Sequence, residues 1–83
     1  MDTVSYIRRQ AEKYGWYKYF SVARPIDIGT CPTSGIMDSI NYGERTEVKN
    51  GLMAWEEIYY NRPLTAQEMR EYELVRAQER SIE

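Results

Sequence analysis

The sequence predicts an α+β fold: a small, mostly antiparallel sheet of three to four strands, an N-terminal helix and a short capped helix near the C-terminus. Three observations support this. Apolar residues recur at helical spacing in the first fourteen residues, two aromatic runs of strand length follow, and a helix-capping motif comes after the second run. The 83 residues fit one domain, and 42% hydrophobic with 29% charged residues is typical of a folded chain.

The segment 1–16 is expected to hold the N-terminal helix, over residues 2–14. Asp2 or Thr3 can accept hydrogen bonds from the first free backbone N–H groups. Gly15 is a residue type that commonly ends helices. Apolar residues fall at helical spacing at Val4, Ile7, Ala11 and Tyr14.

The aromatic run 16–25 predicts a strand that ends at Pro25. Because side chains alternate along a strand, its two faces carry different residues. We expect the core to lie on the face of Lys18, Phe20 and Val22, with Lys18 at the rim.

Brief strands are expected over 39–42 and 46–48, before a tight turn at Asn50–Gly51, where both residue types tolerate positive φ. The run 52–61 predicts a second long strand, apolar on both faces and therefore covered on both sides at least in part. Glu56 and Glu57 interrupt it and, as neighbours, should point to opposite faces.

The segment 63–69 predicts the start of the second helix. Thr65 and Glu68 complete a capping box, and Leu64 with Met69 fits a hydrophobic staple, so we expect a helix over 66–72. The following 72–75 fits either a last short strand or more helix, and the polar tail 77–83 is expected to fray.

The reactive residues argue against most enzyme classes. The chain has no histidine, so its single cysteine, Cys31, lacks the usual base, and we interpret it as a turn or packing residue. The residues 29–35 do not match a Walker phosphate loop. We therefore predict no metal, no cofactor and no enzymatic activity, although a carboxylate-based activity stays open.

The charge is uneven along the chain. The net charge is −2; residues 1–43 carry five basic and four acidic groups (+1), and residues 44–83 carry six and nine (−3). This balance favours an acidic surface for a basic protein partner. The candidate partner-binding residues are Glu44, Glu47, Glu56, Glu57, Tyr59 and Tyr60. One of the paired glutamates is expected to be half-buried and to contact Arg24 or Arg45.

A second hypothesis is a nucleic-acid-binding face on which aromatic rings lie among basic side chains. Its residues would be Arg8, Arg9, Trp16, Tyr17, Lys18 and Tyr19. The chain contains no run of about 18 apolar residues, so we expect no membrane span. One cysteine fits a reducing compartment, so we expect a cytoplasmic protein.

Five short motifs follow one another along the chain: Arg24–Pro25, Gly29–Thr30–Pro32, Ala54–Trp55, Pro63–Leu64–Thr65 and Tyr72–Glu73–Leu74. Taken together, over about 17–76, they resemble a small domain of large polyvalent proteins from phages and conjugative elements. That group includes domains labelled defence against restriction.

The resemblance carries no catalytic residues. It implies a mobile-element accessory protein that binds and blocks a host defence system, such as a restriction or CRISPR nuclease. An assembly module of a larger phage or conjugative complex, with self-association, is a further alternative.

Overall fold

The fold is a four-stranded antiparallel sheet with two helices, which confirms the predicted α+β class. The computed structural model describes residues 2–24, 29 and 31–77. The elements in chain order are α1 Thr3–Tyr14, β1 Tyr17–Ser21, β2 Ile36–Lys49, β3 Leu52–Tyr60, α2 Ala66–Tyr72 and β4 Leu74–Arg76.

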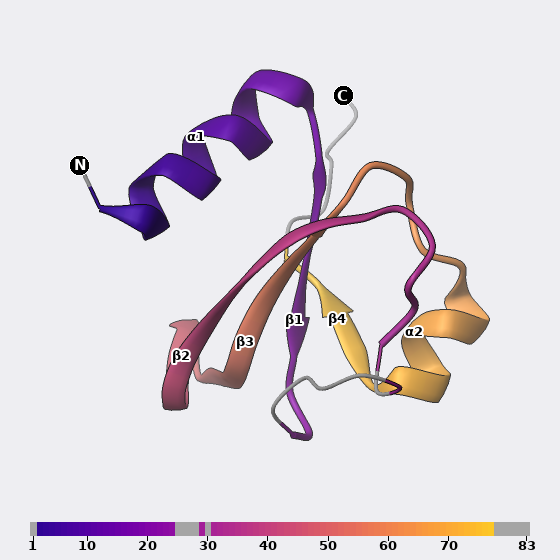
Figure 1. The fold of residues 1–83 in the computed structure, drawn as a ribbon. Coiled ribbons are helices and arrows are strands. Elements are labelled where there is room, and N and C mark those ends of the chain that lie inside the picture. Colours follow the sequence, from indigo (N-terminus) through magenta and orange to yellow (C-terminus); the bar gives the residue numbers. More distant parts are fainter. Residues whose placement is uncertain (1, 25–28, 30, 78–83) are drawn as a thin grey trace.

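The strands lie in the order β2-β3-β1-β4, so β3 and β1 are central. Figure 1 shows α1 and α2 on different sides of the sheet. The register sets which side chains share a face: Tyr19 lies opposite Ile58, and Lys18 lies opposite Tyr59. Because neighbouring residues point to opposite faces, the first pair belongs to the α2 side and the second to the α1 side.

The α2 side holds the larger aromatic core. Tyr19 and Tyr60 are fully buried there and meet edge to face, with 5.9 Å between ring centroids. The cluster consists of Tyr19, Ile58, Tyr60, Leu64 and Leu74, with Tyr17, Met69 and Tyr72 packed against it.

The prediction for the core face of β1 is therefore wrong. Tyr19 and Ser21 are buried as deeply as Phe20. Both faces are covered, one by α1 and the other by α2, so alternation along the strand does not single out one apolar face. The strand also ends at Ser21, and Pro25, its predicted end, lies outside the described residues.

The α1 side is packed by fewer apolar groups. Its cluster consists of Ile7, Ala11, Ile40 and Tyr59, with Trp16 and Tyr42 packed against it. The helix ends as the sequence predicts. The Asp2 side chain accepts a hydrogen bond from the Ser5 N–H, and Gly15 adopts a left-handed conformation with φ of 69°.

The two brief strands predicted over 39–42 and 46–48 are parts of one strand, β2. Pairing with β3 carries the strand across register shifts between residues 41 and 46, where Gly43 has φ of 81°. The predicted turn is confirmed, with φ of 31° at Asn50 and 86° at Gly51.

The second helix and the end of the chain follow the local signals. The capping box at Thr65 and Glu68 is present, and α2 spans the predicted residues. Glu73 adopts a left-handed conformation and ends the helix, so the next residues form β4 and do not extend the helix. Apart from Ala77, the tail expected to fray lies outside the described residues. Neither of the helices described has the length and apolar character needed to cross a bilayer.

Candidate functional site

A buried carboxylate lies between α1 and the sheet. The Glu57 side chain comes from β3 and is only 1% exposed. Arg8 of α1 donates two hydrogen bonds to it, from Nη2 to Oε1 at 2.8 Å and from Nε to Oε2 at 3.0 Å. The hydroxyls of Tyr42 and Tyr59 also donate to it, and the Lys18 ammonium lies 3.7 Å away. We call these five residues the Glu57 centre.

The Glu57 centre holds fixed charges at neutral pH. Burial by itself would raise the pKa of Glu57, but the hydrogen bonds from Arg8, Tyr42 and Tyr59 outweigh burial and lower that pKa to about 2. Burial, together with the Glu57 charge, raises the pKa of both tyrosines well above its ordinary value. The carboxylate therefore stays ionised and the two hydroxyls keep their protons.

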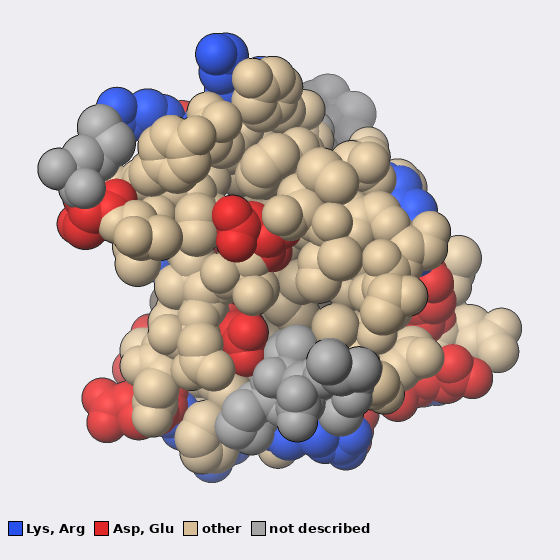
Figure 2. Space-filling model, in the orientation of Figure 1, with Lys and Arg blue, Asp and Glu red and all other residues tan. Residues whose placement is uncertain are grey.

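Two hollows flank the Arg8–Glu57 bridge. The larger, about 460 Å³, lies beside α1 and is lined by Ser5, Arg8, Arg9, Ala11, Glu12, Lys18 and Tyr59. The second, about 360 Å³, extends toward the β2–β3 hairpin and is lined by Arg8, Lys18, Phe20, Tyr42, Thr46, Glu47, Val48 and Glu57. Figure 2 shows the molecular surface indented between α1 and this hairpin. Arg8 and Lys18 line both hollows.

A row of aromatic rings leads from the larger hollow to the surface. Trp16 packs against Tyr59 with 6.4 Å between ring centroids. On its other side it stacks on Tyr14 at 5.9 Å, with the two ring planes 25° apart. Tyr14 is 58% exposed, and the Lys13 ammonium lies 5.4 Å from its ring centroid.

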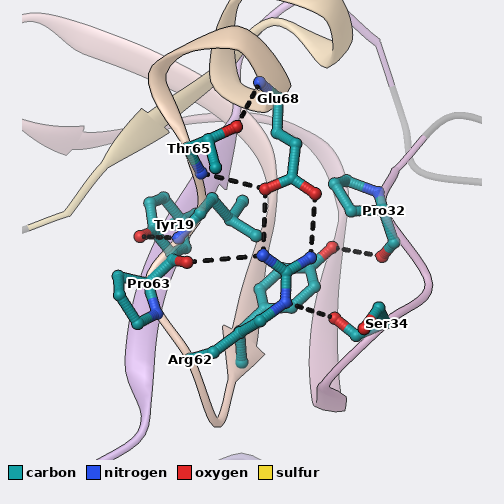
Figure 3. Close-up of polar contacts among 9 residues, drawn as sticks. Tyr19, Pro32, Ser34, Arg62, Pro63, Thr65 and Glu68 are labelled. Atoms are coloured by element: carbon teal, nitrogen blue, oxygen red, sulfur yellow. Dashed lines mark hydrogen bonds and ion pairs between the residues drawn. The ribbon is translucent and has the colours of Figure 1, made fainter.

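A second polar network, on the α2 side, is centred on Arg62 (Figure 3). Its guanidinium makes two 2.9 Å bonds to the Glu68 carboxylate and one 3.0 Å bond from Nε to the Ser34 carbonyl oxygen. Glu68 also accepts from the Thr65 N–H, which is its part in the capping box. The network therefore joins the start of α2 to the loop before β2.

Buried tyrosine hydroxyls hydrogen-bond the loop before β2 and the connection between β3 and α2. Tyr60 donates to the Pro32 carbonyl oxygen at 2.7 Å, and Tyr19 accepts from the Leu64 N–H at 2.8 Å. At Gly35 φ is 83°, and an added Cβ would lie 2.7 Å from the Asn61 side chain. The described residues of the sequence motifs in the loop before β2 and at the cap of α2 therefore have a structural role.

Cys31 fits its interpretation as a packing residue. It is buried in the same loop, and burial raises the pKa of its thiol.

The acidic surface expected from the sequence does not form as a unit. Glu56, Glu57, Tyr59 and Tyr60 are all buried, because both faces of β3 are covered. Only Glu44 and Glu47 of that set are exposed, both on β2.

For Glu57, the expected ion pair with Arg24 or Arg45 is wrong. Glu57 pairs with Arg8 and Lys18, whereas Arg24 pairs with Glu73. Glu56 is 4% exposed on the opposite face and accepts from the Asn41 side chain at 3.4 Å.

The expected nucleic-acid face is split by the sheet. Arg8, Arg9 and Lys18 line the larger hollow, and Trp16 lies on the same side. Tyr17 and Tyr19 belong to the α2 side, where Tyr19 is fully buried.

Sequence reasoning missed Tyr42 and the exposure of Tyr14. Tyr42 reaches Glu57 across a strand pair that no local pattern predicts, and Tyr14 falls in the apolar row of α1 although its ring faces outward. Within the described segments, no three histidine, cysteine, aspartate or glutamate side chains gather to hold a metal ion.

Comparison with known proteins identifies the chain by family. No curated protein and no solved structure matches it significantly. One family model does match, that of "Defence against restriction A C-terminal", over residues 14–79. The match includes the segment 17–76 that carried the resemblance, and it begins at Tyr14, within α1. The chain therefore belongs to the Defence against restriction A C-terminal family.

Proposed function

We propose that this chain is a non-enzymatic interaction protein of a mobile element such as a phage. It binds a protein of a host restriction system in the bacterial cytoplasm and thereby protects the element's DNA. Membership of the defence-against-restriction family is the observation that carries this proposal. Binding, inhibition and the identity of the target are our inference.

The outer edge of β2 is the surface that best suits a protein partner. This strand has 14 residues and lies at one edge of the sheet, so its outer backbone groups pair with no other described strand. A partner segment can add to such an edge through main-chain hydrogen bonds, with side chains giving specificity.

Exposed side chains along β2 provide that specificity. Ile36 and Met37, at its start, are 37% and 41% exposed and would serve as apolar anchors. Glu44 and Glu47 are exposed further along the strand and would contact basic side chains of the partner. These two are the residues of the predicted acidic surface that a partner can reach.

The groups of the Glu57 centre are poorly suited to acid–base catalysis. A general acid or base works best with a pKa near the working pH. Here the pKa of Glu57 is lowered to about 2, and those of its tyrosine neighbours are raised away from neutrality. The cluster stabilises the packing of α1 and does not exchange protons at neutral pH.

The proposal is tested by expressing the chain in a restricting host and measuring how efficiently unmodified phage or plasmid DNA is established. A tagged copy is recovered in parallel from nuclease-treated lysate, with purified restriction enzyme as the probe. The β2 variant combines Met37→Ser with Glu44→Lys. The matched control, Val4→Ser with Glu71→Lys, changes another exposed apolar and acidic pair away from β2.

Wild type and control should protect the DNA and retain the restriction enzyme, and the β2 variant should do neither while staying folded. Absence of protection by the wild type contradicts the proposed function. Protection that survives in the β2 variant contradicts the surface. The same assay with a CRISPR nuclease tests the broader anti-defence role, and recovery of the chain alone would favour an assembly module.

A further inference from the structure

The larger hollow gathers basic side chains whose charged groups are only partly engaged by the fold. Arg8 gives Nε and Nη2 to Glu57, but its side chain is still 50% exposed and lines the hollow. The Lys18 ammonium is 3.7 Å from Glu57 and 5.4 Å from the Phe20 ring centroid, so it makes an ion pair without a hydrogen bond. Arg9 is exposed and lines the same hollow.

The local charge suits an anion although the whole chain is acidic. Three cations, Arg8, Arg9 and Lys18, face two carboxylates, Glu12 and Glu57, which leaves +1. The Glu57 carboxylate is buried and bonded to Arg8. A ligand in the hollow would therefore contact Arg8 and Lys18 before it reached Glu57.

The aromatic row of Tyr59, Trp16 and Tyr14 begins at the hollow that holds these cations. Its inner ring, Tyr59, lines the hollow, and its outer ring, Tyr14, is open to solvent. Tyr14 stacks on Trp16 and is 58% exposed, and the Lys13 ammonium lies 5.4 Å from its ring centroid. An exposed ring beside a cation can accept a nucleobase. Phosphate-binding cations next to a stacking surface are the two parts of a single-strand binding site.

We propose that the α1 side of the molecule binds single-stranded nucleic acid, with backbone phosphates in the hollow at Arg8, Arg9 and Lys18 and a base stacked on Tyr14. This site differs from the face expected from the sequence, because Tyr17 and Tyr19 take no part and Tyr14 does. The inference goes beyond the proposed function and does not rest on it, since the β2 edge belongs to another surface.

The test is the fluorescence anisotropy of a labelled oligothymidine of about 12 nucleotides, a length within the usual range for one site. The full chain is titrated at several salt concentrations. Three phosphate contacts predict a slope of log affinity against log salt of about −2. Raising salt from about 50 mM to about 200 mM should therefore weaken binding by about 20-fold.

Variants are chosen outside the Glu57 centre so that the fold is kept. Tyr14→Ala should weaken binding by about tenfold, because it removes one stacking ring. Arg9→Gln should reduce the salt slope by about 0.7. The matched controls are Tyr6→Ala, an exposed tyrosine two turns earlier on the same helix, and Arg70→Gln, an exposed arginine on α2. Both controls should bind like the wild type.

No binding of the oligonucleotide at about 50 mM salt would overturn the proposal, as would binding that does not respond to salt. Equal losses in Tyr14→Ala and Tyr6→Ala would show that the strand does not stack where we place it. Stronger competition by a duplex of the same sequence than by the single strand would likewise contradict stacking. A failure of these tests leaves the β2 experiment unaffected, so the two proposals can fail separately.

Discussion

The two sides of the sheet are stabilised in different ways. On the α2 side, Arg62 is partly exposed and joins groups that are close in sequence, Pro63 and Glu68, to one loop. On the α1 side, Glu57 is buried and its main partner, Arg8, lies 49 residues away. The α2 side therefore combines apolar packing with a local polar network at its rim, and the α1 side combines a smaller apolar cluster with one buried charge.

This difference matters for function because the two hollows described above both lie on the α1 side. Tyr19, Tyr60 and Leu64 fill the α2 side with buried apolar groups. On the α1 side, Arg8 and Lys18 line both hollows, and Glu57 positions them. The Glu57 carboxylate, which holds α1 in place, therefore also positions the two cations that a ligand could contact.

The largest effect is expected from Glu57→Gln. Breaking a buried ion pair by neutralising one partner costs about 3 to 5 kcal/mol, and we expect about 3 kcal/mol because Arg8 is half exposed and can regain water. The measurement is urea denaturation, with amide hydrogen exchange to locate the change. Protection should fall more in α1 than in α2.

Glu44→Gln is the control for this variant, since it neutralises an exposed glutamate and should change the free energy of unfolding by less than about 0.5 kcal/mol. If the two variants unfold at the same urea concentration, the α1 side does not depend on the buried charge.

A smaller effect is expected from Thr65→Ala on the other side. The side chain of Thr65 accepts from the Glu68 N–H in the capping box, and loss of such a cap costs about 1 kcal/mol. Urea denaturation should show this loss, with Gln67→Ala, an exposed position of the same helix, as the matched control. If Thr65→Ala lowered the free energy of unfolding as much as Glu57→Gln does, the claim that the two sides are stabilised differently would be wrong.

The sequence was most informative where the structure is local. The cap at Thr65, the turn at Asn50–Gly51 and the end of α1 at Gly15 each follow from a few neighbouring residues, and all three are confirmed. The continuity of β2 did not follow, because it depends on pairing with β3 across an irregular stretch.

The candidate site was harder to predict for the same reason. The sequence indicated a half-buried glutamate at most, because the partners that bury Glu57, Arg8 and Tyr42, come from distant elements. In a strand that is covered on both faces, the alternation of apolar and polar residues does not indicate which polar residues are buried. Arg8, Arg9 and Lys18, which the sequence grouped on one face, do line one hollow, whereas Tyr17 and Tyr19 lie on the other side of the sheet.

The most direct test of this account is the titration of the Glu57 carboxyl group, followed by its carbon chemical shift in labelled protein while the amide signals of the folded state persist. The pKa of a glutamate that Arg8, Tyr42 and Tyr59 keep ionised should be about 2, against an ordinary value of 4.5. Since the folded-state pKa is the lower one, the stability contributed by Glu57 is present above the ordinary value and is lost as pH falls toward 2. We predict a signal that stays in its ionised position down to about pH 3. A midpoint at or above 4.5 would contradict the buried, charged centre on which the α1 side depends.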